Sequence, residues 1–367
     1  MKVGYIFNHS TVIGGGELSQ LDLTDAIRDC GVVPVGIVPA QGEITEWLAN
    51  KKIAVHIMEW PALNLAGCLR FPGVIKSVKV KFKALGVDLI HVNGARCMLY
   101  AGPAARSLKI PCVWHVRVLN RDFILDRIRA YYADAIIANS RAVANTLKSY
   151  IPLRRNIEVI YNGFRLPELL AASPVNLQKE FGLPAGPVIL AVGRFSPGKG
   201  FDDLIRACGL LQRGGTSFSC LLVGKALGVE SNRELELKKL AAQAAPGNIY
   251  FPGWRRDIPA LMKAAAILAA PSREESFGRT IPEAWACGLP VVAARTGGPA
   301  EIITHGETGL LVEPGDVPAL AGAIEKLISD EALRDRLAVN GAARAKDFSL
   351  DRHAKNIFAL YQELARA

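Results

Sequence analysis

Two carboxylates, Glu275 and Glu283, follow an apolar run that is typical of a buried strand. A helix is expected to begin near Arg279–Pro282, because proline is tolerated in the first turn of a helix. The free amides of a helix start suit a phosphate group. Carboxylates on either side of that phosphate can accept hydrogen bonds from hydroxyls, which suits a sugar on one flank and a ribose on the other. Taken alone, however, two acids at a helix start are more often solvated residues that stabilise the helix dipole.

Two cations form a second candidate pair. Arg194 and Lys199 lie in a turn rich in glycine and proline, directly after the apolar run Val188–Val192. The planar fork of arginine and the compact charge of lysine could together neutralise a diphosphate. Two solvated loop cations fit the spacing as well. The turn is not a Walker A loop, because the pattern G-x-x-x-x-G-K-[ST] is absent.

The elements that must position these residues alternate along all 367 residues. The expected strands are Lys2–Phe7, Val32–Pro39, Ala54–Met58, Val87–Val92, Cys112–Val116, Ala135–Ala138, Ile157–Ile160, Val188–Val192, Cys220–Val223, a strand beginning at Ile249, Ala264–Ala270 and Leu289–Ala294. Helical stretches between them predict an α/β fold with parallel sheets covered on both faces. Ligands of such sheets bind at the carboxyl ends of the strands, so the residues that follow strands are the candidates.

The length suits two domains. The Asn162-Gly163 turn closes the first series of strands, and a stretch with several prolines follows it. We therefore expect a first domain at residues 1–165, a second domain at 166–347 and a final helix at 348–367.

Further candidates follow the strands of the first half. The loop at 14–17, GGGE, opens a helix, and its glycines would let the backbone approach a ligand closely, although a plain tight turn is as good an explanation. His115 lies at the end of a strand, and His9 and Asn93 follow two others. A lone histidine is more often a core or surface residue than a functional one.

Together these segments resemble the retaining glycosyltransferases of family 4, which have the GT-B fold. ESFGRTIPEAWACGLPVVA, at 275–293, is similar to the E-x7-E segment of the family, and GRFSPGKG, at 193–200, to its G-R-x-x-x-x-K-G loop. GGGE at 14–17 is similar to its G-G-x-E loop, ANS at 138–140 to its A-N-S segment, and VIYNGF at 159–164 to its V-I-P-N-G-V hinge. The resemblance spans nearly the whole chain.

The resemblance implies two Rossmann-like domains whose parallel sheets face a central cleft. The first domain would lie on the acceptor side, the second would bind a nucleotide diphosphate sugar, and the last helix would cross back to the first domain. Transfer would retain the anomeric configuration by front-face displacement, without a protein nucleophile. The sequence contains no D-x-D, so we expect no catalytic metal and no cofactor.

Residue roles follow from the resemblance in the same way. Arg194 and Lys199 would stabilise charge on the leaving diphosphate, while Glu275 and His115 would contact the donor sugar and Glu283 the ribose. The remaining expected donor contacts are Gly15, Gly16, Trp254, Arg255, Ser276, Phe277, Gly278, Arg279 and Thr280, and the expected acceptor contacts are His9, Asn93 and Arg117. His115 is followed here by Val116 and Arg117, whereas the family commonly has an acid after the histidine.

The net charge of +10 lies mostly in residues 1–170 and could favour an anionic partner. The stretch at 70–83, RFPGVIKSVKVKFK, carries five basic residues. It could bind an anionic membrane surface, or it could be an ordinary helix with a solvated basic side. No nucleic-acid-binding motif is present. The seven cysteines include no C-x-x-C and suit reduced thiols in a cytoplasm. We therefore expect a cytoplasmic protein, which residues 70–83 could attach to the inner face of the membrane.

The expected function is thus transfer of a sugar to a glycan or lipid-linked acceptor of envelope polysaccharide synthesis. Two alternatives come from other classes of protein. One is a sugar-nucleotide epimerase with the GT-B shape, and the other is a non-catalytic nucleotide-sugar binding protein. The four charged residues Glu275, Glu283, Arg194 and Lys199 argue against a site that has decayed.

Overall fold

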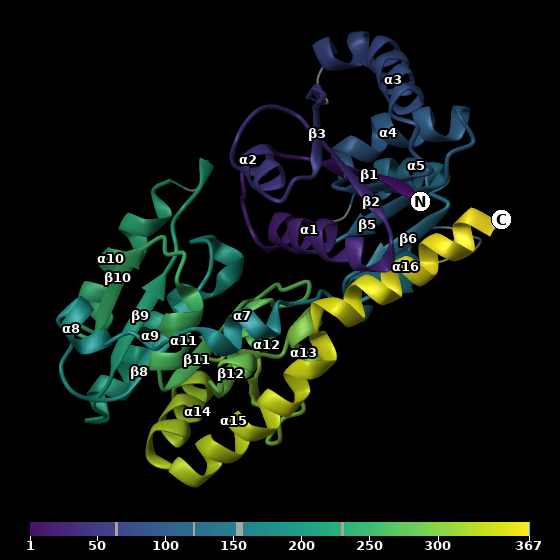
Figure 1. The fold of residues 1–367 in the computed structure, drawn as a ribbon. Coiled ribbons are helices and arrows are strands. Elements are labelled where there is room, and N and C mark those ends of the chain that lie inside the picture. Colours follow the sequence, from purple (N-terminus) through teal and green to yellow (C-terminus); the bar gives the residue numbers. More distant parts are fainter. Residues whose placement is uncertain (63–64, 120–121, 152–156, 229–230, 367) are drawn as a thin grey trace. The chain divides into compact units, whose positions relative to one another are not determined.

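The computed structural model describes residues 1–62, 65–119, 122–151, 157–228 and 231–366. The chain folds into two compact units. The first unit comprises Met1–Phe164 and Ser349–Ala367, and the second comprises Arg165–Phe348. Each unit is built on a parallel sheet with helices packed around it (Figure 1).

The sheet of the first unit has seven strands in the order β3-β2-β1-β4-β5-β6-β7. The elements of this unit are β1 (Lys2–Phe7), α1 (Gly15–Ala26), a 3-10 turn (Ile27–Cys30), β2 (Val33–Val38), α2 (Glu43–Asn50), β3 (Ala54–Ile57), α3 (Leu65–Leu85), β4 (Leu89–Asn93), α4 (Ala95–Ser107), β5 (Cys112–Val116), α5 (Phe123–Tyr132), β6 (Ala135–Ala138), α6 (Arg141–Lys148), β7 (Ile157–Val159) and α16 (Leu350–Arg366).

Both faces of this sheet are buried, which explains why most residues of its strands are apolar. Side chains of a strand alternate between the two faces. Tyr5 and Phe7 therefore belong to one core and Ile6 to the other. The last helix, α16, contributes Ile357 and Tyr361 to the core that contains Tyr5, and it packs against α1 (Figure 1).

The sheet of the second unit has six strands in the order β10-β9-β8-β11-β12-β13. The elements of this unit are α7 (Leu166–Ala171), α8 (Leu177–Phe181), β8 (Val188–Val192), a 3-10 turn (Pro197–Lys199), α9 (Phe201–Arg213), β9 (Ser219–Val223), α10 (Arg233–Ala244), β10 (Ile249–Gly253), α11 (Ile258–Ala264), β11 (Ile267–Ala270), α12 (Thr280–Ala286), β12 (Val291–Ala294), α13 (Gly297–Ile302), β13 (Leu310–Val312), α14 (Val317–Ser329), α15 (Glu331–Ala345) and a 3-10 turn (Lys346–Phe348).

The α/β architecture predicted from the alternating pattern is confirmed. The strand predicted at Ala264–Ala270 is shorter than expected and begins at Ile267. The difference arises because the apolar run continues back into the end of α11, where Ala264 is the last helical residue. The helix expected near Arg279–Pro282 begins at Thr280.

The basic stretch at 70–83 lies within α3. Val78 and Phe82 are fully buried and belong to the core of the first unit, so this side of the helix packs against its own fold. Lys76, Lys79 and Lys83 are exposed. Among the described residues, no helix has the length and apolar content needed to cross a membrane.

Candidate functional site

The two predicted loops of the second unit leave neighbouring strands of its sheet. β8 pairs with β9 on one side and with β11 on the other, where Leu190 lies opposite Leu268. The order of strands along the chain therefore reverses between β8 and β11. Ligands of open α/β sheets bind beyond the carboxyl ends of the strands at such a point. The segments that leave there are residues 193–200 and 271–279.

These two segments touch through their backbones. The amide of Arg273 donates a hydrogen bond to the carbonyl of Gly198 at 2.8 Å. Gly200 has a φ of +65°, and a Cβ at this position would lie 2.1 Å from the carbonyl oxygen of Pro271. Only glycine combines this backbone conformation with so close an approach. The glycine of this GKG sequence therefore lets residues 193–200, the lysine loop, contact residues 271–279, the carboxylate loop.

The closest contact between the two loops joins two of the predicted residues. The ammonium of Lys199 lies 2.5 Å from Oε2 of Glu275, and the hydroxyl of Ser272 lies 3.4 Å from the same oxygen. Both charged side chains are partly exposed, at 31% for the lysine and 16% for the glutamate. A small pocket at this point is lined by Val192, Lys199, Phe201, Ala269, Ala270, Pro271, Ser272, Glu275, Gly278, Thr280, Ile281 and Pro299.

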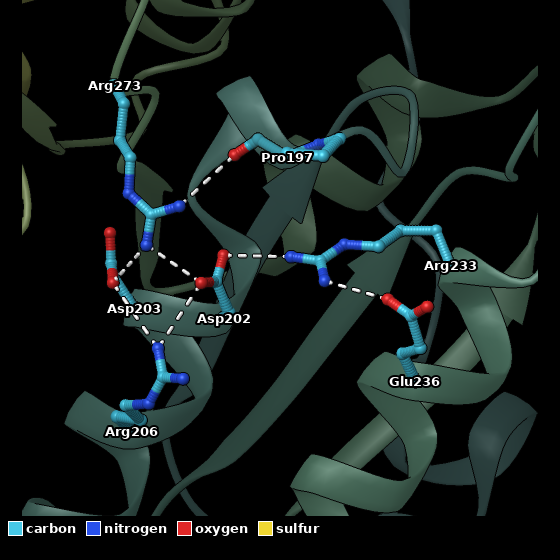
Figure 2. A network of polar contacts seen from close by, with 7 residues as sticks. All are labelled: Pro197, Asp202, Asp203, Arg206, Arg233, Glu236 and Arg273. Carbon is cyan, nitrogen blue, oxygen red and sulfur yellow. Dashed lines mark hydrogen bonds and ion pairs between the residues drawn. The ribbon is translucent and has the colours of Figure 1, made fainter. Parts of the chain in front are cut away.

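A network of ion pairs around Arg273 connects the carboxylate loop to α9 (Figure 2). The guanidinium of Arg273 lies 2.7 Å from Asp202 and 2.6 Å from Asp203, both in the first turn of α9. Arg206 and Arg233 bind Asp202 from the other sides at 3.2 and 3.1 Å. Burial alone would raise the pKa of Asp202, but the hydrogen bond and charge of Arg273 bring that pKa below its usual value. The network thus ties the loop at 271–279 to the helix that follows the lysine loop.

The carboxylate loop also contacts the start of α13. The amide of Gly298 donates to the carbonyl of Glu275 at 3.0 Å, and the hydroxyl of Thr296 donates to the carbonyl of Ser272 at 3.0 Å. A Cβ on Gly298 would lie 2.3 Å from the Cα of Phe277. The absence of a side chain at Gly298 therefore permits this contact, so the carboxylate loop is held by both α9 and α13.

Not every predicted donor residue lines the pocket. Gly278 and Thr280 do, whereas Glu283 is paired with Arg279, whose guanidinium lies 3.2 Å from its carboxylate. Arg194 is an exposed residue of the other loop.

Two of the expected donor contacts, Trp254 and Arg255, differ in their surroundings. Trp254 is 45% exposed, and the ammonium of Lys225 lies 5.1 Å from the centre of its ring. Arg255 instead forms ion pairs with Asp257 at 2.7 Å and with Glu180 at 2.5 Å. The tryptophan therefore has a free ring surface, while the arginine is engaged within its own unit.

The first unit has the same kind of reversal between β1 and β4. Phe7 lies opposite Asn93, and Asn93 lies opposite His115. The side-chain amide of Asn93 donates to the carbonyl of Gly16 at 3.4 Å, which connects the end of β4 to the glycine loop. The register therefore brings Gly16, Asn93 and His115 together at the carboxyl ends of the central strands.

At the start of α1, Gly15 is exposed and Gly16 half-buried. The amide of Gly14 donates to the carboxylate of Glu17 at 3.2 Å. His9 is half-buried, and Nδ2 of Asn8 donates to its Nε2 at 2.8 Å. The acid of the GGGE loop therefore has a structural role at the helix start.

Arg117 is buried and directed into its own unit. Its guanidinium donates to Oδ1 of Asn93 at 2.9 Å, to Oδ1 of Asn162, and to Nδ1 of His115 at 3.2 Å. His115 itself is only 1% exposed. Three of the predicted residues of the first unit therefore belong to one hydrogen-bonded cluster.

Comparison with known proteins places both halves of the chain. Residues 13–166 match the family described as Glycosyltransferase Family 4, and residues 176–344 match Glycosyl transferases group 1. Over 345 residues the chain is 33% identical to the lipopolysaccharide core biosynthesis glycosyltransferase LpsE of Rhizobium meliloti (strain 1021), and the match covers 93% of each chain.

The chain belongs to the group 1 glycosyltransferases. This glycosyltransferase is also 30% identical over 329 residues to the lipopolysaccharide core biosynthesis mannosyltransferase LpsB of the same organism, covering 80% of this chain and 88% of that one. A crystal structure of Anabaena Alr3699/HepE in complex with UDP and glucose superposes with a TM-score of 0.87 at 29% identity. The match covers 99% of this chain and 100% of that one, so the fold is GT-B.

Several residues that support the site of this glycosyltransferase lie in no recognisable sequence pattern. Arg273 lies 71 residues from Asp202 and 70 from Asp203 in sequence, and nothing local indicates that they meet. The position of Arg273 just after a strand was the only available signal. Among the described residues, no group of His, Cys, Asp or Glu side chains has the arrangement of a metal site.

Proposed function

We propose that this glycosyltransferase transfers a sugar from a nucleotide diphosphate sugar, with retention of configuration, to a glycan or lipid-linked acceptor of envelope polysaccharide synthesis. The relatives matched over most of their length are named glycosyltransferases, which favours transfer over epimerisation or simple binding. The similar Anabaena protein has been crystallised with UDP and with UDP-glucose, which supports a uridine nucleotide as the donor carrier.

The observation that carries the proposal is the Lys199–Glu275 pair, which lies beside a pocket at the switch point of the second sheet. A diphosphate in this pocket would compete with Glu275 for the ammonium of Lys199. The carboxylate would then be available to accept hydrogen bonds from sugar hydroxyls.

Breaking the anomeric C–O bond builds negative charge on the β-phosphate, and a cation that is already in place stabilises that charge. Lys199 would supply it directly, with Arg194 adding charge from the same loop. α12 has only seven residues, so the loop cations would contribute more than its dipole. Glu283 would bind the ribose hydroxyls after releasing Arg279. We expect neither a metal nor another cofactor to be required.

For the acceptor, His9 is the candidate that best fits direct contact. Asn93 and Arg117 would act by supporting the cluster around them, because both are bonded to other residues of the first unit. A lipid-linked acceptor would also suit the exposed lysines of α3, which could hold the enzyme at an anionic cytoplasmic membrane surface.

Thermal unfolding with UDP, GDP, ADP or TDP in the presence of EDTA tests the donor site. A nucleotide at about 100 times its dissociation constant should stabilise the protein by about 2.7 kcal/mol. We expect UDP to raise the melting temperature and Glu283→Gln to reduce the shift. If none of the four nucleotides shifts the transition of the wild-type protein, the proposed donor site is wrong.

Retention needs a separate test. NMR of the transferred sugar in the product should show the same anomeric configuration as in the donor. An inverted product would contradict the proposed stereochemistry, but it would leave the donor site standing.

A further inference from the structure

A chain of buried polar side chains runs through the first unit from its last helix to the end of β5. The hydroxyl of Tyr5 lies 3.0 Å from the hydroxyl of Tyr361, which lies 2.7 Å from Nδ1 of His91. Nε2 of His91 lies 3.2 Å from Nδ1 of His115, and the guanidinium of Arg117 lies 3.2 Å from the same Nδ1 atom. All five side chains are more than nine-tenths buried.

Arg117 sets the direction of the hydrogen bond to His115. A guanidinium has only N–H donors and stays protonated in proteins, so it cannot accept a hydrogen bond. Nδ1 of His115 must therefore be the acceptor and carry no proton. The orientation of Arg117 is fixed in turn by the oxygens of Asn93 and Asn162, which accept its other N–H groups.

The remaining directions follow from this one. Because Nδ1 of His115 carries no proton, Nε2 of His91 must donate to it. In a neutral His91, Nδ1 is then the acceptor for the hydroxyl of Tyr361. The oxygen of Tyr361 in turn accepts from the hydroxyl of Tyr5. One cation thus determines the polarity of the whole chain.

Both histidines are expected to be neutral at pH 7. Burial lowers the pKa of His115 well below its usual value, and the neighbouring charge of Arg117 lowers it further. The same two causes, in the same order, act on His91. The proton of a neutral His115 must therefore lie on Nε2.

Nε2 of His115 is a buried atom that has no hydrogen-bond partner among the residues that the structure describes. A buried N–H group without an acceptor is rare in folded proteins and calls for an explanation. An oxygen of a bound ligand would provide the missing acceptor.

We propose that Arg117 is a positioning residue that fixes the proton of His115 on Nε2, so that His115 offers a neutral N–H donor to a hydroxyl or phosphate oxygen of the ligand. The identity of this ligand as the donor sugar nucleotide rests on the proposed function. The tautomer does not, because it follows from contacts within the unliganded first unit. Tyr361 and His91 complete the chain, which makes the last helix part of the support of His115.

Nitrogen-15 NMR of the histidine-labelled, unliganded full-length protein at pH 7 tests the tautomer directly. The signals of His115 are assigned by their loss in His115→Asn. We expect a protonated Nε2 and an unprotonated Nδ1 in the wild-type protein. A proton on Nδ1, or on both nitrogens, would overturn the inference.

Variants then test the role of Arg117. Arg117→Met should allow the proton of His115 to distribute over both nitrogens and should lower kcat/KM about two- to tenfold, the range expected for one neutral hydrogen bond. Arg117→Lys keeps a side chain that can only donate, and it should restore the Nε2 proton. Tyr361→Phe should leave the tautomer of His115 unchanged, because Arg117 still donates to Nδ1.

An unchanged tautomer in a folded Arg117→Met protein would remove Arg117 from this role. If Arg117→Met does not fold, Arg117→Gln takes its place, because a glutamine amide can accept as well as donate; an unchanged tautomer in that protein would have the same meaning. Failure of the proposed function would look different: the wild-type protein would keep the Nε2 proton but would show no melting shift with any nucleotide.

Discussion

Gly298 is a position where a single added methyl group should disturb the pocket. Its amide holds the carbonyl of Glu275, and a Cβ in Gly298→Ala would lie 2.3 Å from the Cα and 2.5 Å from the carbonyl oxygen of Phe277. Both are backbone atoms, so no side chain can rotate to relieve the clash. The loop at 271–279 would have to move away from α13.

The cost of this movement can be bounded. Extra atoms in a packed site typically cost about 1–3 kcal/mol. Phe277 is only 1% exposed and packs on Phe348 with ring centres 5.8 Å apart, which leaves it little room to yield. Weakening the hydrogen bond to Glu275 adds about 0.5–1.5 kcal/mol. We therefore expect Gly298→Ala to lose about 1.5–4.5 kcal/mol of unfolding free energy and to bind UDP more weakly than the wild-type protein.

Chemical denaturation and calorimetric UDP titration measure the two effects. Gly322→Ala is a matched control, because Gly322 lies inside α14 and its added Cβ would meet no atom within 4 Å. It should stabilise the helix by about 0.5–1 kcal/mol and leave UDP binding unchanged. A Gly298→Ala protein with wild-type stability and UDP affinity would refute the claim that α13 supports the loop.

Arg273→Met should lower the unfolding free energy by about 1–3 kcal/mol. This loss is smaller than for a fully buried ion pair, because Arg273 is partly exposed and other arginines still bind its two aspartates. An unchanged denaturation midpoint would contradict this expectation. The lowered pKa values of His91 and His115 mean that the unfolded chain binds protons first below about pH 6.5. The stability contributed by the two neutral histidines is therefore fully present above that pH. As the pH falls below it, the free energy of unfolding should decrease by up to about 1.4 kcal/mol per pH unit for each histidine. Equal stability at pH 7.5 and 5.5 would be inconsistent with their burial. Anionic liposomes at low salt should sediment the protein, and Lys76→Glu with Lys79→Glu should weaken this; absence of wild-type binding would exclude the membrane proposal.

The sequence was sufficient to predict the α/β class and to place most strands, because strands buried on both faces are mostly apolar. Several bounds, such as Cys112–Val116 and Ala135–Ala138, agree with the structure. The prediction of a strand from Ala264 is wrong at its start, because an apolar helix end and an apolar strand look alike in sequence.

The site was only partly predictable. Lys199 and Glu275 follow neighbouring strands, so their meeting could be expected from the rule about carboxyl ends. Arg273 could not be placed, since its partners come from another loop and no local pattern connects them. The hydrogen-bond polarity around His115 was equally hidden, because it depends on Arg117 and on the oxygens of Asn93 and Asn162 that orient its guanidinium.

The central claim is that Lys199 and its loop bind the diphosphate of the donor without a metal. Calorimetric titration of the wild-type protein with UDP and with UMP, both in EDTA, isolates the contribution of the β-phosphate. We predict that UDP binds about 10- to 100-fold more tightly than UMP, the value of a charge-assisted hydrogen bond, and that Lys199→Ala abolishes most of this difference. Lys239→Ala, a lysine on α10 outside the pocket lining, should preserve it. Equal affinities for UDP and UMP in the wild-type protein, or an undiminished difference in Lys199→Ala, would contradict the account.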